Sequence, residues 1–208
     1  MIKYVVFDFD GTLADSKHIF VSAWNSLADK YNFKKLKQEE LDLFQKMTMK
    51  ERGKKLNFPM YKVPVIIPEL YKSFSESLME ISLFPGIKEM LKELETNGYQ
   101  IAIISSNSEE NIKEFLKQKE IENISEVHCS SRIFGKDKMI SKFLKSNNLE
   151  PTEVIYVGDE ERDIIACKKT NVKVIWVNWG YDAEEVVQSV EPDYMVSSPE
   201  KILEVVRG

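Results

Sequence analysis

Apolar runs of strand length alternate with helix-like patterns along this 208-residue chain, and this alternation restricts the fold more than any other feature. Each run ends in polar residues, as buried strands do where they leave a sheet. Strands that alternate with helices form parallel sheets with right-handed crossovers. We therefore predict an α/β fold with strands at residues 2–7, 100–104, 154–157 and 172–177, and a weaker strand at 126–129.

The first predicted strand is followed by a long stretch that contains no second strand. Phe20, Trp24, Leu27 and Tyr31 share one helical face, and residues 41–47 and 70–79 are further helix candidates, with Pro59, Pro64 and Pro68 interrupting the middle. Pro85 and Gly86 mark the return to the sheet. We expect residues 16–83 to form an inserted helical domain, and residues 1–15 and 84–208 to form the α/β core.

Charge, hydropathy and cysteine content limit the partners and the cellular compartment that we expect for this protein. The net charge of −5 argues against nucleic acid or an acidic membrane surface as the main partner, and no apolar stretch has the length of a membrane span. The N-terminal apolar run ends at Asp8 and is typical of a buried strand rather than a signal peptide. Cys129 and Cys167 form no disulfide framework, so we expect free thiols in a cytoplasmic protein.

The segment Asp8-Phe9-Asp10-Gly11-Thr12 directly follows the first predicted strand. Functional groups of a parallel sheet collect at the carboxyl ends of its strands. Two carboxylates as close as Asp8 and Asp10 repel each other unless a cation or a shared proton stabilises them, and Mg²⁺ prefers such oxygen ligands. Gly11 permits close backbone approach, and Thr12 offers a hydroxyl to a phosphate oxygen.

A second acidic segment follows the predicted strand at 154–157. After Gly158, Asp159 stands at the strand end as Asp8 does and could complete a metal site. Asp163 lies one helical turn further and could orient a water that binds the metal. The alternative is that these acids only stabilise a helix N-terminus.

Polar residues at two further helix starts could bind phosphate. Ser105, Ser106 and Asn107 end the strand at 100–104, and a serine hydroxyl with nearby backbone N–H groups suits a phosphate, although serine there is also an ordinary helix cap. Lys136 or Lys138, after Gly135, could neutralise both a phosphate and Asp8, although a lysine there is more commonly a solvated surface charge.

The four segments occur in the order of the strand ends, with the insert directly after the first. Together they resemble the haloacid dehalogenase-like superfamily, specifically its phosphatases with a helical cap after the first strand. Asp8 to Thr12 match the family's first motif, Ser105 the second, Lys136 the third, and Asp159 with Asp163 the fourth. The resemblance covers essentially the whole chain and implies a Rossmann-like parallel core with a small helical cap.

The resemblance implies a magnesium-dependent phosphatase. Asp8 would be the nucleophile that forms a phosphoaspartate, and Asp10 would be the general acid and then the general base. Mg²⁺ would be held by the side chains of Asp8 and Asp159 and the main-chain carbonyl of Asp10, with Asp163 orienting a water. The residues expected to hold the transferring phosphoryl group are Gly11, Thr12, Ser105, Ser106, Asn107 and Lys136.

The substrate class follows from details of the same comparison. Family branches that cleave carbon–halogen or carbon–phosphorus bonds lack the acid at Asp10, so a phosphoester is favoured. The sugar-phosphate mutase branch has a histidine twelve residues after its nucleophile, where this chain has Phe20, and His18 would face elsewhere on a helix. Residues 177–181 resemble a loop of phosphoglycolate phosphatase-like members. We expect a small phosphorylated metabolite as substrate, and a monomer or homodimer.

Three alternatives remain at this point. A phosphomutase or a non-catalytic phosphate-binding protein could have the same fold, although the latter need not retain Asp10. A signalling receiver domain also phosphorylates an Asp, but it has no helical insert after its first strand. Lys50 or Arg52 in the insert could contact the leaving group, or could lie on a solvated helix face.

Overall fold

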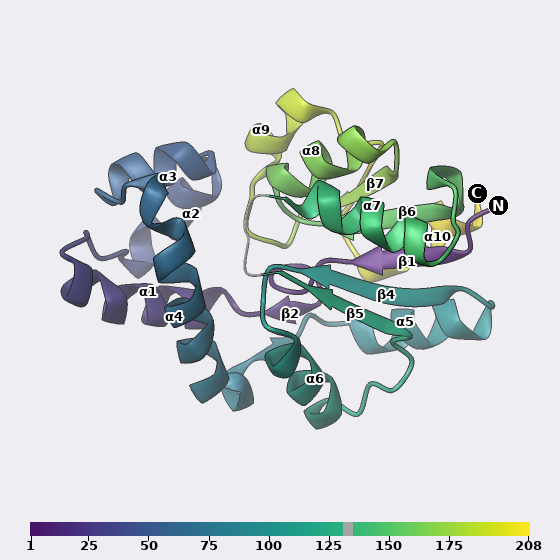
Figure 1. The fold of residues 1–208 in the computed structure, drawn as a ribbon, viewed down its shortest axis with the longest axis horizontal. Coiled ribbons are helices and arrows are strands. Elements are labelled where there is room, and N and C mark those ends of the chain that lie inside the picture. The colour runs from purple at the N-terminus through teal and green to yellow at the C-terminus, as the bar shows by residue number, and fades with distance from the viewer. Residues whose placement is uncertain (131–134) are drawn as a thin grey trace.

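The computed structural model describes residues 1–130 and 135–208. Its sheet has the strand order β5-β4-β1-β6-β7-β8, and every pair of neighbours is parallel (Figure 1). The strands are β1 (Tyr4–Phe7), β4 (Gln100–Ser105), β5 (Glu126–Cys129), β6 (Val154–Gly158), β7 (Lys173–Val177) and β8 (Tyr194–Val196). The predicted parallel α/β sheet is confirmed, with β8 added at one edge.

Helices cover both faces of the sheet. Successive side chains of a strand point to opposite faces, so Val5 and Phe7 pack into one apolar cluster while Val6 packs into another. The first cluster includes residues of α5 (Ile87–Thr96), α6 (Glu109–Gln118) and α10 (Pro199–Arg207). The second includes residues of α7 (Lys136–Ser146), α8 (Glu161–Thr170) and the short α9 (Glu184–Val187), with Trp176 buried in it.

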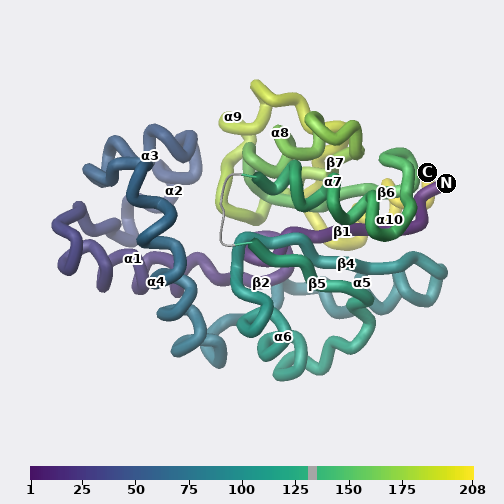
Figure 2. The backbone as a smooth tube through the Cα atoms, in the orientation of Figure 1, coloured from purple at the N-terminus to yellow at the C-terminus, as the bar shows by residue number. Residues whose placement is uncertain are grey.

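The insert consists mainly of helices that lie beyond the carboxyl ends of the strands (Figure 1). They are α1 (Lys17–Tyr31), α2 (Leu41–Gln45), α3 (Met49–Lys55) and α4 (Val63–Glu76). The chain leaves and re-enters the core through β2 (Ala14–Asp15) and β3 (Ser82–Leu83), which pair antiparallel. In Figure 2 the backbone of the insert can be followed away from the core and back beside its own start. Whether residues 16–83 act as a separate domain stays a prediction.

Single 3₁₀ turns connect several of these elements. They lie at Gln38–Glu40, Met60–Lys62, Leu78–Glu80, Pro151–Glu153 and Gln188–Val190. Within residues 1–130 and 135–208, no helix is both long and apolar enough to cross a membrane.

The start of α4 corrects the expectation that prolines interrupt this part of the insert. The helix begins at Val63, with Pro64 in its first turn and Pro68 inside it. Proline is well placed in a first turn, where its missing N–H would have no helical partner, but an interior proline removes one backbone hydrogen bond. Burial of Ile66, Leu70 and Phe74 along one face of α4 offsets that loss.

The register of the central strands decides where the polar ends meet. Phe7 of β1 pairs with Ile103 of β4 on one side and with Val157 of β6 on the other. The residues that follow these three positions therefore gather at one edge of the sheet, facing the insert. This edge carries the candidate site.

Candidate active site

Asp8 stands at the centre of this edge and is almost completely buried. Its backbone N–H continues the strand ladder by donating to the carbonyl of Val157 at 2.9 Å. One carboxylate oxygen accepts from the N–H of Phe9 at 2.7 Å, and the other accepts from the ammonium of Lys136, also at 2.7 Å. Asp8 is therefore oriented by two donors on different elements.

Lys136, the first residue of α7, is the lysine that reaches the site, whereas Lys138 is exposed. Its ammonium also pairs with the carboxylate of Asp163. Burial lowers the pKa of Lys136, but the charges of Asp163 and Asp8 outweigh burial and keep the pKa above its ordinary value. Lys136 therefore carries its charge between two buried carboxylates.

Asp10 occupies a different environment from Asp8. One carboxylate oxygen accepts from the hydroxyl of Ser16 at 2.8 Å, and the other accepts from the amide of Asn107 at 2.8 Å. Burial raises the pKa of Asp10 to about 6, the two hydrogen bonds oppose that rise, and the charge of Asp8 adds to it. A carboxyl group with a pKa near neutrality can both give and take a proton.

The residues after β4 form a compact polar loop. The N–H of Asn107 donates to the hydroxyl of Ser105 at 3.2 Å, so the loop is held by its own side chains. The hydroxyl of Ser106 is 2.9 Å from the hydroxyl of Tyr71, in α4 of the insert. It also accepts from the guanidinium of Arg162 at 3.2 Å. Ser106 therefore links the core to the insert.

Asp159 follows β6 at the same edge of the sheet, as the sequence predicts, and its role as a metal ligand stays a prediction. It is fully buried, and its two carboxylate oxygens accept from the hydroxyl of Thr12 at 2.6 Å and the N–H of Tyr181 at 2.7 Å. The Thr12 hydroxyl, expected to meet a phosphate oxygen, is thus donated to Asp159. Gly11 is required here, because a Cβ at its position would lie 2.3 Å from an oxygen of Asp159.

A buried group of acids adjoins Asp8. One carboxylate oxygen from each of Asp8, Glu160 and Asp163 lies within 4.8 Å of the other two. Burial raises the pKa of Asp163 to about 7, with Lys136 opposing the rise, and burial likewise raises the pKa of Asp159 well above its ordinary value. Buried carboxylate oxygens at this spacing suit a hard divalent cation, which would favour their ionised forms.

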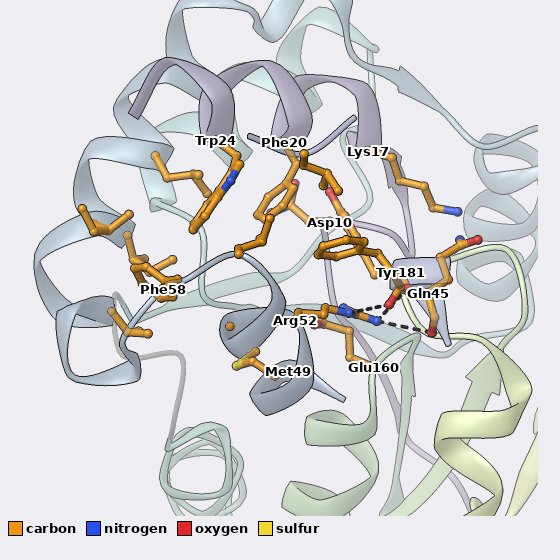
Figure 3. A pocket seen from close by; sticks show the side chains of 18 of the residues that line it. Asp10, Lys17, Phe20, Trp24, Gln45, Met49, Arg52, Phe58, Glu160 and Tyr181 are labelled. Carbon is orange, nitrogen blue, oxygen red and sulfur yellow. Dashed lines mark hydrogen bonds between the residues drawn. The ribbon is translucent and has the colours of Figure 1, made fainter. Parts of the chain in front are cut away.

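Two basic residues of the insert, Lys50 and Arg52, lie in different environments. Lys50 is exposed, whereas Arg52 of α3 turns toward the core (Figure 3). The guanidinium of Arg52 pairs with Asp182 and donates to the carbonyl oxygens of Phe44 at 2.8 Å and Tyr181 at 3.2 Å. Its donors therefore join the insert to the loop after β7.

Several further polar residues belong to the site, although no sequence pattern indicates a role for them. Ser16 holds Asp10, Tyr71 reaches Ser106 from the insert, and Glu160 belongs to the acid group. Arg162 lies inside the segment that includes Asp159 and Asp163, and it pairs with Glu160. The only sequence feature that could have indicated a role for Arg162 is its position as a cation among four acids at a predicted helix start.

The fold and this arrangement of residues define a family. Residues 5–177 match the family model of the haloacid dehalogenase-like hydrolases, and the chain belongs to that family. The prediction of a hydrolase of this superfamily is confirmed.

Named relatives are similar over nearly the whole chain. A phosphoglycolate phosphatase from Synechococcus elongatus is 25% identical over 206 residues, which are 99% of this chain and 97% of that protein. The pyrophosphatase PpaX from Bacillus mycoides is 21% identical over 98% of this chain and 96% of its own length. A haloacid dehalogenase-like hydrolase from Streptococcus pneumoniae shares the fold, with a TM-score of 0.82, 21% identity and coverage of 99% and 98% of the two chains. The expectation of a phosphatase-type enzyme agrees with the names of these relatives.

Proposed function

We propose that this protein is a magnesium-dependent phosphatase that hydrolyses a small phosphomonoester through a phosphoaspartate on Asp8. The observation that supports this most is the contrast between Asp8 and Asp10. Asp8 is held by Phe9 and the charged Lys136, whereas Asp10 is held by neutral donors and has a pKa of about 6. Such a pair suits a nucleophile beside an acid–base group.

In the first step, a carboxylate oxygen of Asp8 attacks phosphorus and the bond from phosphorus to the ester oxygen breaks. Asp10 gives its proton to the departing oxygen, so the leaving group departs as an alcohol. In the second step Asp10 takes a proton from water, the water oxygen bonds to phosphorus, and the bond from Asp8 to phosphorus breaks. Asp8 is thereby regenerated and inorganic phosphate is released.

The phosphoryl oxygens would be held by Lys136, Ser105, Ser106 and Asn107, with backbone N–H groups near Gly11. Ser105 accepts a hydrogen bond from the N–H of Asn107, so its own O–H can be donated to the phosphoryl group. Thr12 contributes by holding Asp159. Phosphoryl transfer depends mostly on positioning and charge stabilisation of this kind.

Magnesium would be held by Asp8, the main-chain carbonyl of Asp10 and Asp159, with Asp163 orienting a water; Glu160 adds a further carboxylate beside them. When bound, it would neutralise negative charge on the phosphoryl oxygens. A small phosphorylated metabolite in the cytoplasm is the proposed substrate, which the names of the relatives and the two free thiols support.

A phosphomutase is less well supported. Phe20, at the position of the mutase histidine, packs its ring against Trp24 and Tyr181 and offers no proton-transfer group.

Hydrolysis of p-nitrophenyl phosphate tests the proposal, with the protein first treated with EDTA and then supplied with Mg²⁺. We expect turnover only after Mg²⁺ is added, and phosphate on Asp8 in protein quenched during turnover and examined by mass spectrometry. Full turnover by protein shown to be metal-free, or silence across a broad panel of phosphomonoesters, contradicts the proposal.

A further inference from the structure

A cavity of about 320 Å³ opens beside Asp10 and extends into the insert (Figure 3). Its lining comes mainly from the four helices of the insert and is mostly apolar. Phe20, Trp24, Leu41, Phe44, Met49 and Phe58 are among the lining residues. Small-molecule sites commonly have this size and an apolar lining with a few polar groups at one end. Here the polar end is the one that carries Asp10.

The cations that line the cavity, among the described residues, already have partners. Arg52 is paired with Asp182, and Arg162 with Glu160. Lys17 donates to the carbonyl of Trp179 at 2.8 Å, and Figure 3 shows it extending away from Trp24 and Phe58. A carboxylate carried between the helices of the insert would therefore meet guanidinium groups that are already ion-paired, and a charge left unpaired is costly where water is excluded.

Most charged groups of the lining also have a counterpart of opposite sign. With Asp10 ionised, the cations Lys17, Arg52 and Arg162 are matched by the acids Asp10, Asp42 and Glu160, and protonation of Asp10 changes this balance by one unit only. Beyond them the described lining consists mainly of aromatic rings and alkyl side chains, and the amide of Gln45 already donates to the carbonyl of Gly180. Burying such apolar surface lowers the free energy when an apolar group displaces water from it. The cavity therefore favours an uncharged, apolar occupant.

We propose that this cavity takes the leaving group of the substrate, and that the substrate is a phosphate monoester of an apolar alcohol with an alkyl chain or an aromatic ring. The inference rests on the proposed phosphatase function, because Asp10 marks the end at which the phosphoryl group binds. The ester oxygen lies at Asp10, and the apolar part of the substrate extends between α1, α2 and α4. This chain thus differs in substrate class from relatives named for phosphoglycolate.

The first test is the kcat/KM of the magnesium-loaded wild-type protein for n-alkyl phosphates from methyl to hexyl, with phenyl phosphate and 2-phosphoglycolate in the same series. We expect kcat/KM to rise about fourfold per added methylene, the factor that corresponds to burying one methylene. We also expect hexyl phosphate, whose alcohol leaving group is no more acidic than that of phosphoglycolate, to exceed phosphoglycolate. Rates that are flat with chain length, or highest for phosphoglycolate, overturn the inference and leave the phosphatase function standing.

A matched pair of variants locates the effect. Leu41 lines the cavity, whereas Leu43 of the same helix is 48% exposed and lies outside its lining. Leu41→Trp fills the cavity, so the ratio of kcat/KM for hexyl over methyl phosphate should fall at least about tenfold, while Leu43→Trp should keep the wild-type ratio. If the two variants, both folded by circular dichroism, give the same ratio, the leaving group does not occupy this cavity.

Measuring the binding of a ligand that cannot be hydrolysed tests the apolar site independently of catalysis. Titration calorimetry with n-alkylphosphonates, which have no ester bond to cleave, should show affinity that rises with chain length and a negative heat-capacity change. If no phosphate ester is hydrolysed but this dependence persists, the proposed phosphatase function fails and the apolar site stands. If hydrolysis occurs but phosphonate affinity does not depend on chain length, the apolar site fails and the phosphatase stands.

Discussion

Asp8 and Asp10 are separated by one residue, yet the structure surrounds them with different partners. Lys136 reaches Asp8 from α7, which the chain forms far downstream, whereas Asp10 is held by Ser16 and Asn107. The tight turn at Gly11 and the buried Phe9 between the two acids direct them into these separate environments. One carboxylate can then serve as the nucleophile and the other as the proton carrier, because the environment of a carboxyl group determines whether it is ionised or protonated.

Replacing Asp8 tests the nucleophile. Asp8→Asn keeps the shape and still accepts from Phe9, but an amide oxygen does not form a phosphoaspartate. We expect turnover of p-nitrophenyl phosphate to fall by roughly three orders of magnitude or more, with a retained fold by circular dichroism. The same substitution at the exposed Asp29 should leave turnover unchanged. Near-wild-type turnover by folded Asp8→Asn protein would falsify the assigned role.

Replacing Asp10 tests the proton carrier, because its importance depends on the leaving group. An alkoxide is a poor leaving group without a proton, whereas p-nitrophenolate leaves readily. Asp10→Asn should therefore slow phosphorylation of Asp8 by about 10²- to 10⁴-fold with an alkyl phosphate and far less with p-nitrophenyl phosphate. Hydrolysis of the phosphoaspartate should slow for both substrates. In single-turnover kinetics, equal slowing of the first step with both leaving groups would remove Asp10 from this role.

At the residue scale, the sequence indicates those site residues that follow strand ends. Asp8, Ser105 and Asp159 could be proposed together because parallel strands bring their carboxyl ends to one edge. Tyr71 and Ser16 could not, because they reach the site from the insert and its start, and no local pattern reveals which face of an inserted helix meets the core. The hydrogen bond from Thr12 to Asp159 could not be predicted from the sequence either, because it depends on side-chain rotamers.

At the scale of elements, α4 shows why a helix pattern can be misread. Its two prolines suggested a break, and only the segment from residue 70 was expected to be helical. The structure instead continues the helix through Pro68, because Ile66, Ile67, Leu70 and Phe74 are buried along one face. Burial of these side chains stabilises the helix by more than the missing backbone hydrogen bond destabilises it. Local helix propensity does not include this contribution from tertiary packing.

A matched pair of substitutions in α4 tests this explanation. Phe74 is 1% exposed, whereas Val65 of the same helix is 58% exposed. Phe74→Ala should lower the free energy of unfolding by about 3–5 kcal/mol, because it removes a buried ring and leaves a cavity. Val65→Ala should change it by no more than about 0.5 kcal/mol. Urea denaturation of both proteins measures the difference, and equal effects would mean that the buried face of α4 does not stabilise the fold.

Strand prediction succeeded where a strand is long and apolar on both sides. β1, β4, β6 and β7 lie inside the sheet, and helices on both faces require continuous apolar runs there. β8 has three residues, and β2 and β3 have two each, which is too short to produce a pattern. The ribbon of β2 and β3 follows from the return of the insert to its starting point, so it depends on the fold as a whole.

At the scale of the whole molecule, the buried edge of the sheet holds more acid than base. Asp8, Asp10, Asp159, Glu160 and Asp163 face Lys136 and Arg162. An ordinary Asp carboxyl has a pKa of 3.8, and burial raises the pKa of Asp10 to about 6 and that of Asp163 to about 7. At a pH between 3.8 and these raised values, the folded protein holds protons that the unfolded chain has released. Stability from this source is fully present below pH 3.8 and is lost as the pH rises through 6 to 7.

The metal-free protein should therefore become less stable as the pH rises from 5 to 7.5, and Mg²⁺ should oppose that loss. The exposed acids Glu51, Glu69 and Glu153 have lowered pKa values, but they act below this range and do not affect the comparison. We expect Tm in EDTA to fall by at least about 3 °C over this range, and saturating Mg²⁺ to raise Tm more at pH 7.5 than at pH 5, because the cation favours the ionised forms of Asp159 and Asp163, which protons oppose. Asp10→Asn should reduce the pH dependence measured in EDTA. Differential scanning fluorimetry at several pH values measures both effects, and a Tm in EDTA that rises toward pH 7.5 would show that the buried acids do not hold protons in the folded protein.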